Sequence, residues 1–186
     1  GGGNCRDEET GRFASCGLDD VPDELQAEIA YENCADCPKL RANKSMYNDC
    51  NSSCTRLVVS AGKTPPPNAF DKYTGLIDLT WTDAALQTVP DQILGLPKLQ
   101  KLDLSDNQLT SLPDTIGQLS SLTNLRLSDN QLTSLPDTIG QLSSLMKLVL
   151  YNNQLTSMPA TIGKLSSLTF LWVENNQLTS LPATIG

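Results

Sequence analysis

The stretch Ser105-Asp-Asn-Gln-Leu-Thr-Ser-Leu-Pro-Asp-Thr-Ile-Gly-Gln-Leu-Ser-Ser-Leu122 returns letter for letter at residues 128–145. The two copies are 23 residues apart, and the frame continues through residues 145–167 into an incomplete unit, residues 168–186. Each unit fits the pattern L-x-x-L-x-L-x-x-N-x-L-x-x-L-P-x-x-I-G-x-L-x-x. A fixed period of about 20 to 30 residues is typical of a solenoid, in which one structural unit per repeat stacks on the next.

The start of each unit predicts a short strand. Leu102 and Leu104 alternate with Lys101 and Asp103, which is the period of a strand with one buried face. Because one unit has too few apolar residues to offset the conformational entropy of ordering it, we expect neighbouring units to stabilise each other.

The rest of the unit predicts a turn and a return segment without a long helix. Asn107 follows the strand, and its side-chain amide can serve the backbone groups of a turn. Pro113 and Gly117 then oppose a long helix, so we expect an irregular segment or a single short turn.

This pattern resembles the leucine-rich-repeat family in its 23-residue form. The resemblance covers about residues 76–186 and implies a curved α/β-type solenoid with a short parallel β-sheet on its concave face. It does not imply a particular ligand. The repeats are residues 76–98, 99–121, 122–144, 145–167 and the incomplete 168–186.

The first repeat departs from the pattern. Trp81 stands where leucine is usual, and Ala84 stands where asparagine is usual. Terminal repeats are often atypical because they must fit a different neighbour. We therefore expect Trp81 to pack between the repeats and the segment that precedes them.

Residues 1–62 are predicted to form a small cysteine-rich cap. All six cysteines of the chain lie there, namely Cys5, Cys16, Cys34, Cys37, Cys50 and Cys54. An even cysteine set in a small loop-rich segment favours three disulfides, whose pairing the sequence does not define. The alternative is a zinc site, because Cys34-x-x-Cys37 and Cys50-x-x-x-Cys54 have nearly the spacing of zinc ligands.

Two further features of this segment bear on location and structure. Asn43 and Asn51 each begin an N-glycosylation sequon, so together with the cysteines they predict a secreted or cell-surface glycoprotein. Residues 20–31 carry Asp at the start and apolar residues on one helical face, which predicts a short helix in the cap. Residues 63–75, with three consecutive prolines, predict a stiff connector.

Charge and composition exclude several classes of function. The net charge is −8, with 21 acidic and 13 basic residues, which disfavours nucleic acid and anionic membranes as partners. No apolar run approaches the length of a membrane span. The chain has no histidine, the usual general base and a common metal ligand, so we predict no enzymatic activity, no cofactor and no metal in the repeats.

The outward strand positions predict where a ligand binds. The first repeats place small and charged residues there, whereas the last two place apolar and aromatic ones. Grouped aromatic residues on a water-facing surface suggest an anchor for a partner. The predicted contact residues for a protein or glycan are Lys147, Val149, Tyr151, Phe170, Trp172 and Glu174.

The last unit predicts a second kind of contact. Its apolar residues, including Leu178, Leu181 and Ile185, would leave an apolar end face and an unpaired strand edge. Further repeats could follow, the edge could be tolerated, or another molecule could cover it. The main hypothesis is extracellular recognition, the alternative is a subunit that associates with copies of itself in a fibre, sheath or wall, and a weaker one is an intracellular signalling scaffold.

Overall fold

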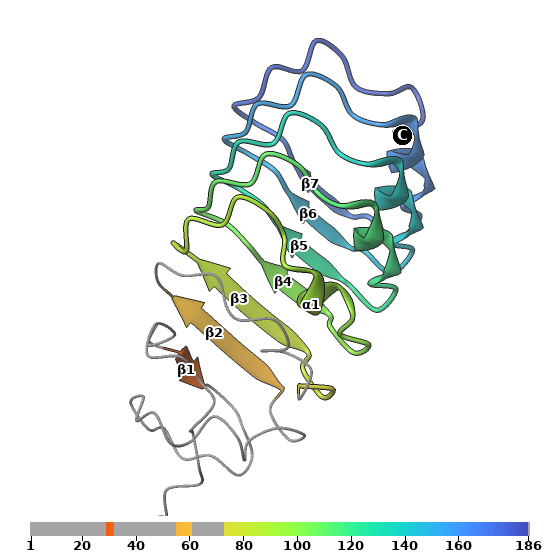
Figure 1. Ribbon diagram of the computed structural model, residues 1–186. Coiled ribbons are helices and arrows are strands. Elements are labelled where there is room, and N and C mark those ends of the chain that lie inside the picture. The colour runs from red at the N-terminus through yellow and green to blue at the C-terminus, as the bar shows by residue number, and fades with distance from the viewer. Residues whose placement is uncertain (1–28, 32–54, 61–72, 186) are drawn as a thin grey trace, which may run out of the picture.

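The repeats stack into one continuous sheet (Figure 1). The structure is a computed structural model that describes residues 29–31, 55–60 and 73–185. Within these residues, the strands are β1 Ile29–Tyr31, β2 Arg56–Ser60, β3 Asp78–Thr82, β4 Lys101–Asp103, β5 Asn124–Arg126, β6 Lys147–Val149 and β7 Phe170–Trp172. They lie side by side in sequence order. β1 is antiparallel to β2, and every later pair is parallel, which confirms the predicted parallel sheet.

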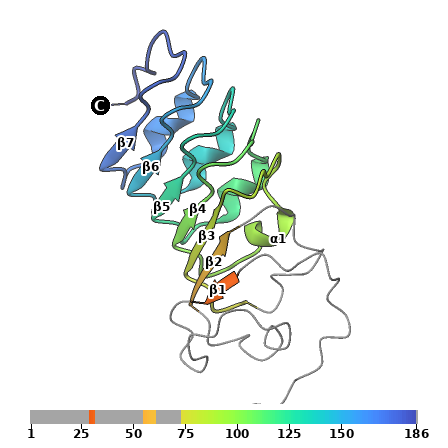
Figure 2. The same ribbon diagram turned by 90° about the vertical axis from the view of Figure 1, so that its left-hand side faces the viewer.

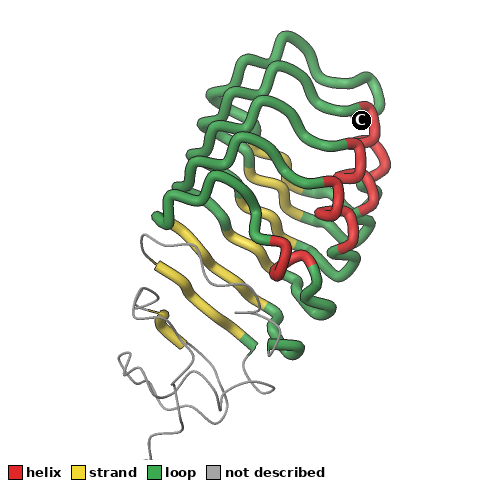
Figure 3. The backbone as a smooth tube through the Cα atoms, viewed as in Figure 1, coloured by secondary structure: helices red, strands yellow, loops and turns green. Residues whose placement is uncertain are grey.

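Short helices line the side of the stack opposite the sheet (Figures 2 and 3). They are α1 Asp91–Leu94, followed by the 3-10 helices η2 Asp114–Gln118, η3 Asp137–Gln141 and η4 Ala160–Lys164. A proline with extended backbone precedes each one, as Pro113 does before η2. This confirms the short return segments that the proline and glycine of each repeat predicted. We call the outward surface of β2 to β7, on the concave side of the stack, the strand face.

The core is a column of leucines and isoleucines enclosed between the strands and the return segments. In the repeat that begins at Leu99, the side chains of Leu102, Leu104, Leu109 and Ile116 are almost completely buried. Each such side chain stabilises the fold by about 1.5 to 3 kcal/mol when it is removed from water. Since the same positions of adjacent repeats form one core cluster, this stabilisation is shared along the stack.

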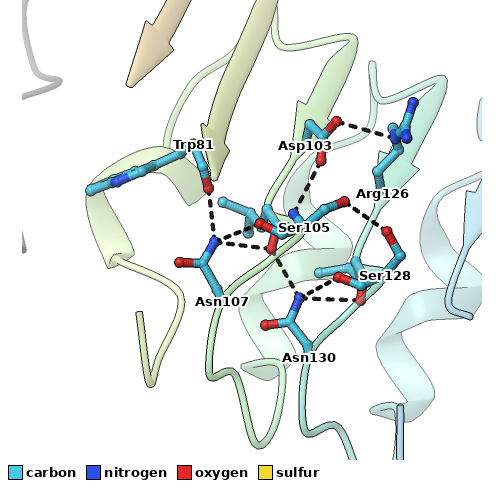
Figure 4. Close-up of polar contacts among 9 residues, drawn as sticks. Trp81, Asp103, Ser105, Asn107, Arg126, Ser128 and Asn130 are labelled. Atoms are coloured by element: carbon cyan, nitrogen blue, oxygen red, sulfur yellow. Dashed lines mark hydrogen bonds and ion pairs between the residues drawn. The ribbon is translucent and has the colours of Figure 1, made fainter. Parts of the chain in front are cut away.

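Asparagine side chains form hydrogen bonds between each repeat and the one before it (Figure 4). Asn107 Nδ2 donates to Trp81 O at 2.8 Å in the preceding repeat and to Leu104 O at 3.1 Å in its own. Its Oδ1 accepts the backbone N–H groups of Ala84 and Leu86, each at 3.1 Å. The later repeats repeat this arrangement with Asn130, Asn153 and Asn176. The predicted turn role of this asparagine is confirmed, and it also joins adjacent repeats.

The sheet extends further toward the N-terminus than the predicted repeats do. β2 lies within the segment assigned to the cap, yet it is parallel to β3, with Leu57 opposite Leu79 and Val59 opposite Trp81. Leu57, Val59 and Trp81 are all buried. Trp81 thus packs between the predicted repeats and the preceding segment, as expected.

The helix predicted over residues 20–31 is wrong at its C-terminal end. Residues 29–31 form strand β1, which pairs with β2 from Ile29 opposite Val59 to Tyr31 opposite Leu57. β2 offers an unpaired row of backbone groups, and pairing with it satisfies more of them than an isolated short helix would. Residues 20–28 lie outside the described residues, as do the six cysteines, Asn43, Asn51 and residues 63–72 of the connector.

Candidate functional site

The strand register arranges the outward side chains of the strand face in three columns. In the first column, Asp78, Lys101, Asn124, Lys147 and Phe170 follow one another from β3 to β7. In the middle column, the order is Thr80, Asp103, Arg126, Val149 and Trp172. The third column, two residues further along each repeat, contains Thr82, Ser105, Ser128, Tyr151 and Glu174. Neighbours within a column are about 4.8 Å apart, so their side chains interact directly.

Charged groups in the N-terminal half of this face pair with each other. Arg56 Nε and Lys101 Nζ both lie 3.6 Å from Asp78 Oδ2. Arg126 Nε lies 3.1 Å from Asp103 Oδ2 (Figure 4). Because these pairs are partly exposed, each contributes little to stability, on the order of 0 to 1 kcal/mol. They do, however, engage every one of these five charges, and they leave this half of the strand face with one more cation than carboxylate.

Two serines on this face are buried, although the sequence predicted that they face water. Ser128 is 1% exposed, and its Oγ donates to Ser105 Oγ at 3.0 Å. Ser105 N also donates to Asp103 Oδ1 at 3.0 Å. The two hydroxyls belong to adjacent repeats and satisfy one another across them (Figure 4).

The C-terminal half of the strand face carries an aromatic cluster, which we define as Tyr151, Phe170 and Trp172. The Tyr151 and Trp172 ring centroids are 4.7 Å apart at an interplanar angle of 45°. The Phe170 and Trp172 rings meet edge to face, with centroids 6.1 Å apart. Lys147 Nζ lies 4.9 Å from the centroid of the Phe170 ring. The structure therefore brings together four of the six residues predicted to contact a ligand.

This cluster is open to water at two of its rings. Phe170 is 44% exposed and Trp172 is 40% exposed, whereas Leu171 between them is half-buried and packs on the core. Glu174 is exposed beyond the end of β7, in the column next to Trp172. The surface thus combines exposed aromatic rings, one cation and one carboxylate.

Val149 corrects the sequence analysis, which expected it to face water beside the aromatic residues. Its side chain is only 1% exposed. In the sheet it lies between Arg126 of β5 and Trp172 of β7. This burial leaves Val149 almost no surface for a ligand to contact.

Met146 is an exposed apolar residue that the sequence analysis did not single out. It is 50% exposed, and its carbonyl oxygen accepts the N–H of Phe170 at 3.0 Å. The equivalent positions of the other repeats hold Ile77, Gln100, Thr123 and Thr169. An apolar residue between two threonines of this column was the available signal.

The three residues predicted to form a self-association face all belong to the last repeat. Leu181 is 49% exposed, whereas Leu178 and Ile185 are half-buried and pack on the core. Leu178 and Leu181 line a shallow pocket with Val173. This association stays a prediction.

A column of aspartate and asparagine runs along the turns that follow the strands. All of its members have left-handed backbone conformation, with φ between 54° and 57°, and they are Asp83, Asp106, Asp129, Asn152 and Asn175. Asparagine and aspartate tolerate this conformation better than most residues. Asn175 Nδ2 donates to Asn152 Oδ1 at 2.7 Å, and Asn152 Nδ2 donates to Asp129 Oδ1 at 2.7 Å.

The side-chain hydrogen bonds of this column end at Asp129. The preceding members, Asp106 and Asp83, are carboxylates like Asp129 and carry the same charge. Burial raises the pKa of Asp106, and the neighbouring carboxylates of Asp129, Asp83 and Asp103 raise it further, against a lowering effect of Arg126. Since the folded-state pKa is above the unfolded one, ionised Asp106 lowers stability at neutral pH. This loss disappears as the pH falls through the raised pKa to the unfolded value.

We therefore expect Asp129→Asn to stabilise the protein at pH 7. The change removes the like charge that raises the pKa of Asp106 most, and the new amide can donate to Asp106 as Asn152 donates to Asp129. The thermal midpoint should rise by about 1 to 2 °C, measured by circular dichroism. The rise in the thermal midpoint should be smaller at pH 3. Asp137→Asn removes a charge from the same repeat outside this column, so an equal gain in that control would contradict the explanation.

Neither a metal centre nor a membrane helix is evident in the described part of the chain. Residues 29–31, 55–60 and 73–185 contain no group of three histidine, cysteine or acidic side chains placed to hold a metal ion. None of the helices in these ranges has the length and hydropathy to cross a membrane.

Comparisons with known proteins point to one family. The family model described as leucine rich repeat matches residues 79–132 and 120–178. A comparison with curated proteins finds no match.

Solved structures share the fold over about two thirds of the chain. A leucine-rich-repeat protein of Leptospira interrogans is 41% identical with a TM-score of 0.64, and the match covers 67% of this chain and 32% of that one. The ectodomain of the Arabidopsis thaliana receptor kinase GASSHO1/SCHENGEN3, solved with CASPARIAN STRIP INTEGRITY FACTOR 2, is 40% identical with a TM-score of 0.58, covering 64% and 15%. The Arabidopsis BIR3–SERK2 complex gives 31% identity and a TM-score of 0.52, covering 59% and 61%. The chain thus spans less than two thirds of each of these proteins.

Proposed function

Since the chain belongs to the leucine-rich-repeat family, we propose that it is a non-enzymatic recognition module that binds a protein partner through the aromatic half of its strand face. The observation that carries this proposal is the aromatic cluster, with Phe170 and Trp172 exposed on a surface built from regular strands.

The composition of the cluster fits protein recognition. Aromatic residues, methionine and arginine are enriched at the cores of protein interfaces, and tryptophan and tyrosine often provide most of the binding energy. Here Met146, Phe170 and Trp172 are the exposed large apolar residues nearest the strand face. The N-terminal half offers less, because its charges are already paired with each other and a ligand would have to compete with those pairs.

Similar structures support a protein rather than a small molecule as the partner. The GASSHO1/SCHENGEN3 ectodomain was solved with CASPARIAN STRIP INTEGRITY FACTOR 2, and BIR3 was solved with SERK2. One is an ectodomain and the other a complex of other proteins, and their likeness to this chain serves only as support. Together with the six cysteines and the sequons at Asn43 and Asn51, it favours a secreted or cell-surface location.

The strand face supports binding better than catalysis. Asp78 and Asp103, the carboxylates of its N-terminal half, are held by Arg56, Lys101 and Arg126. The chain has no histidine that could act as a general base. We therefore propose recognition without a chemical step.

Selection of peptide ligands tests this function. A phage library of random 12-residue peptides is panned on the full chain, and enriched peptides are synthesised and titrated by fluorescence anisotropy. Because an exposed aromatic anchor typically contributes more than about 1.4 kcal/mol, Trp172→Ala should weaken them about tenfold or more. Phe170→Ala provides a second variant with the same expected direction.

Leu181→Ala is the matched control, since Leu181 is exposed to a similar extent but lies outside the cluster. Its peptide affinities should equal those of the unmodified chain. Peptides that bind Trp172→Ala as tightly as the unmodified chain would contradict the proposal. So would enrichment of oligosaccharides on a glycan array without any enriched peptide.

A further inference from the structure

Lys147 is a cation held in place by an aromatic ring. Its Nζ lies 4.9 Å from the Phe170 ring centroid, and its side chain is partly buried. Within the described residues, no carboxylate lies at ion-pair distance from this ammonium group, whereas Arg56, Lys101 and Arg126 each contact an aspartate. Among these strand-face cations, Lys147 is therefore the one whose charge is available to a ligand without breaking an ion pair.

The apolar anchor lies at a fixed offset from this cation. Lys147 of β6 is in register with Phe170 of β7, and Trp172 is two residues further along the same strand. Two residues of an extended strand span about 6.6 Å and place both side chains on the same face. An extended peptide that lies along β7 reproduces this offset between its own positions i and i+2.

The charge of the whole chain limits how acidic such a ligand is. The net charge of −8 repels a strongly acidic partner at long range. The outward positions of the strand face are nearly neutral by comparison, with basic residues Arg56, Lys101, Arg126 and Lys147 against acidic residues Asp78, Asp103 and Glu174. A ligand with one carboxylate that contacts Lys147 therefore fits the charge of this surface, and a ligand with a run of carboxylates does not.

We infer that the strand face binds an extended peptide with a single carboxylate two residues from an aromatic or large aliphatic side chain. The carboxylate contacts Lys147 Nζ, and the apolar side chain packs on Trp172. This inference rests on the proposed function and names the class of partner that the same face selects.

Two matched peptides test this class. Both are acetylated and amidated heptapeptides, Gly-Ser-Glu-Ser-Phe-Ser-Gly and its Gln counterpart, so they differ by one charge. Each is titrated to millimolar concentration into the ¹⁵N-labelled full chain, and the Trp172 indole signal is followed by NMR. The Glu peptide should bind about threefold to tenfold more tightly than the Gln peptide. This preference should fall steeply between 50 and 500 mM NaCl, because salt screens the charge pair.

The variant Lys147→Gln should remove the preference, so that both peptides bind with the affinity of the Gln peptide. Lys164→Gln removes an exposed lysine of η4 on the opposite side of the stack and should leave the preference unchanged. Equal affinities of the two peptides for the unmodified chain would overturn the inference, as would a preference that survives Lys147→Gln. A Trp172 signal that neither peptide shifts would also overturn it. The dependence of library peptides on Trp172 is a separate measurement, so the proposed function can stand when this inference fails.

Discussion

Asn130→Asp should destabilise the protein by about 3 to 5 kcal/mol at pH 7, a large part of the stability of a typical domain. Asn130 is buried, and its Nδ2 donates to Leu104 O at 2.9 Å, Ser128 O at 3.0 Å and Leu127 O at 3.2 Å. An aspartate has the same shape but no donor. The substitution therefore places a buried negative charge against three carbonyl oxygens.

Thermal unfolding by circular dichroism measures this effect, and the midpoint should fall by about 10 °C or more. The substituted carboxyl should have a raised folded-state pKa, because burial and the carbonyl oxygens disfavour its charge. Stability should consequently recover in part as the pH falls and the group becomes protonated.

Gln131→Glu is the matched control, since it makes the same amide-to-acid change at the adjacent, exposed residue. Its midpoint should stay within about 1 °C of that of the unmodified chain. Similar losses at both positions would show that added charge, rather than the lost hydrogen bonds, causes the effect.

Gly140→Ala should destabilise the protein by about 2 to 3 kcal/mol through a steric clash between repeats. Gly140 lies in η3, where a Cβ atom would be 2.8 Å from Thr161 Cβ and would also overlap the Thr161 carbonyl oxygen. Thr161 belongs to η4 of the next repeat, whose distance from η3 is set by the pairing of β5 with β6 and by the asparagine bonds. The clash therefore cannot be relieved by rotating one side chain.

Urea unfolding followed by tryptophan fluorescence tests this expectation against Gly95→Ala. Gly95 follows α1, and the nearest atom to its Cβ would be Gln92 O at 3.9 Å, an ordinary contact. That control should be neutral or slightly stabilising, because alanine restricts the unfolded chain. A midpoint for Gly140→Ala equal to that of Gly95→Ala would show that the repeats can separate without loss of stability.

The periodic part of this fold was predictable from sequence. Leucine spacing, the asparagine after each strand, and the Pro and Gly of the return segment each specify one local structure, and their repetition at 23 residues fixes the stack. The short strands and the turn asparagines appear where these residues predicted them, and the return segments lack a long helix, as Pro and Gly indicated.

The features that were not predicted from sequence depend on residues that are neighbours in space rather than on the local sequence pattern. β1 forms because β2 presents an open edge, and nothing in Ile29–Tyr31 alone distinguishes this from a helix end. Val149 and Ser128 occupy outward positions, yet each is only 1% exposed. Outward position is a property of the strand, whereas exposure depends on the sizes of side chains 23 residues before and after.

The asparagine bonds also bear on how such a chain changes over generations. Asn130 contacts Leu104 O as Asn107 contacts Trp81 O, each 26 residues earlier, so adjacent units meet through the same joint. When a whole repeat is lost or duplicated in the gene, the repeats on either side can form the same asparagine hydrogen bonds with their new neighbours. The number of repeats can therefore change while the core and the spacing between repeats stay the same. The stack can lengthen or shorten without a change in the way its repeats pack.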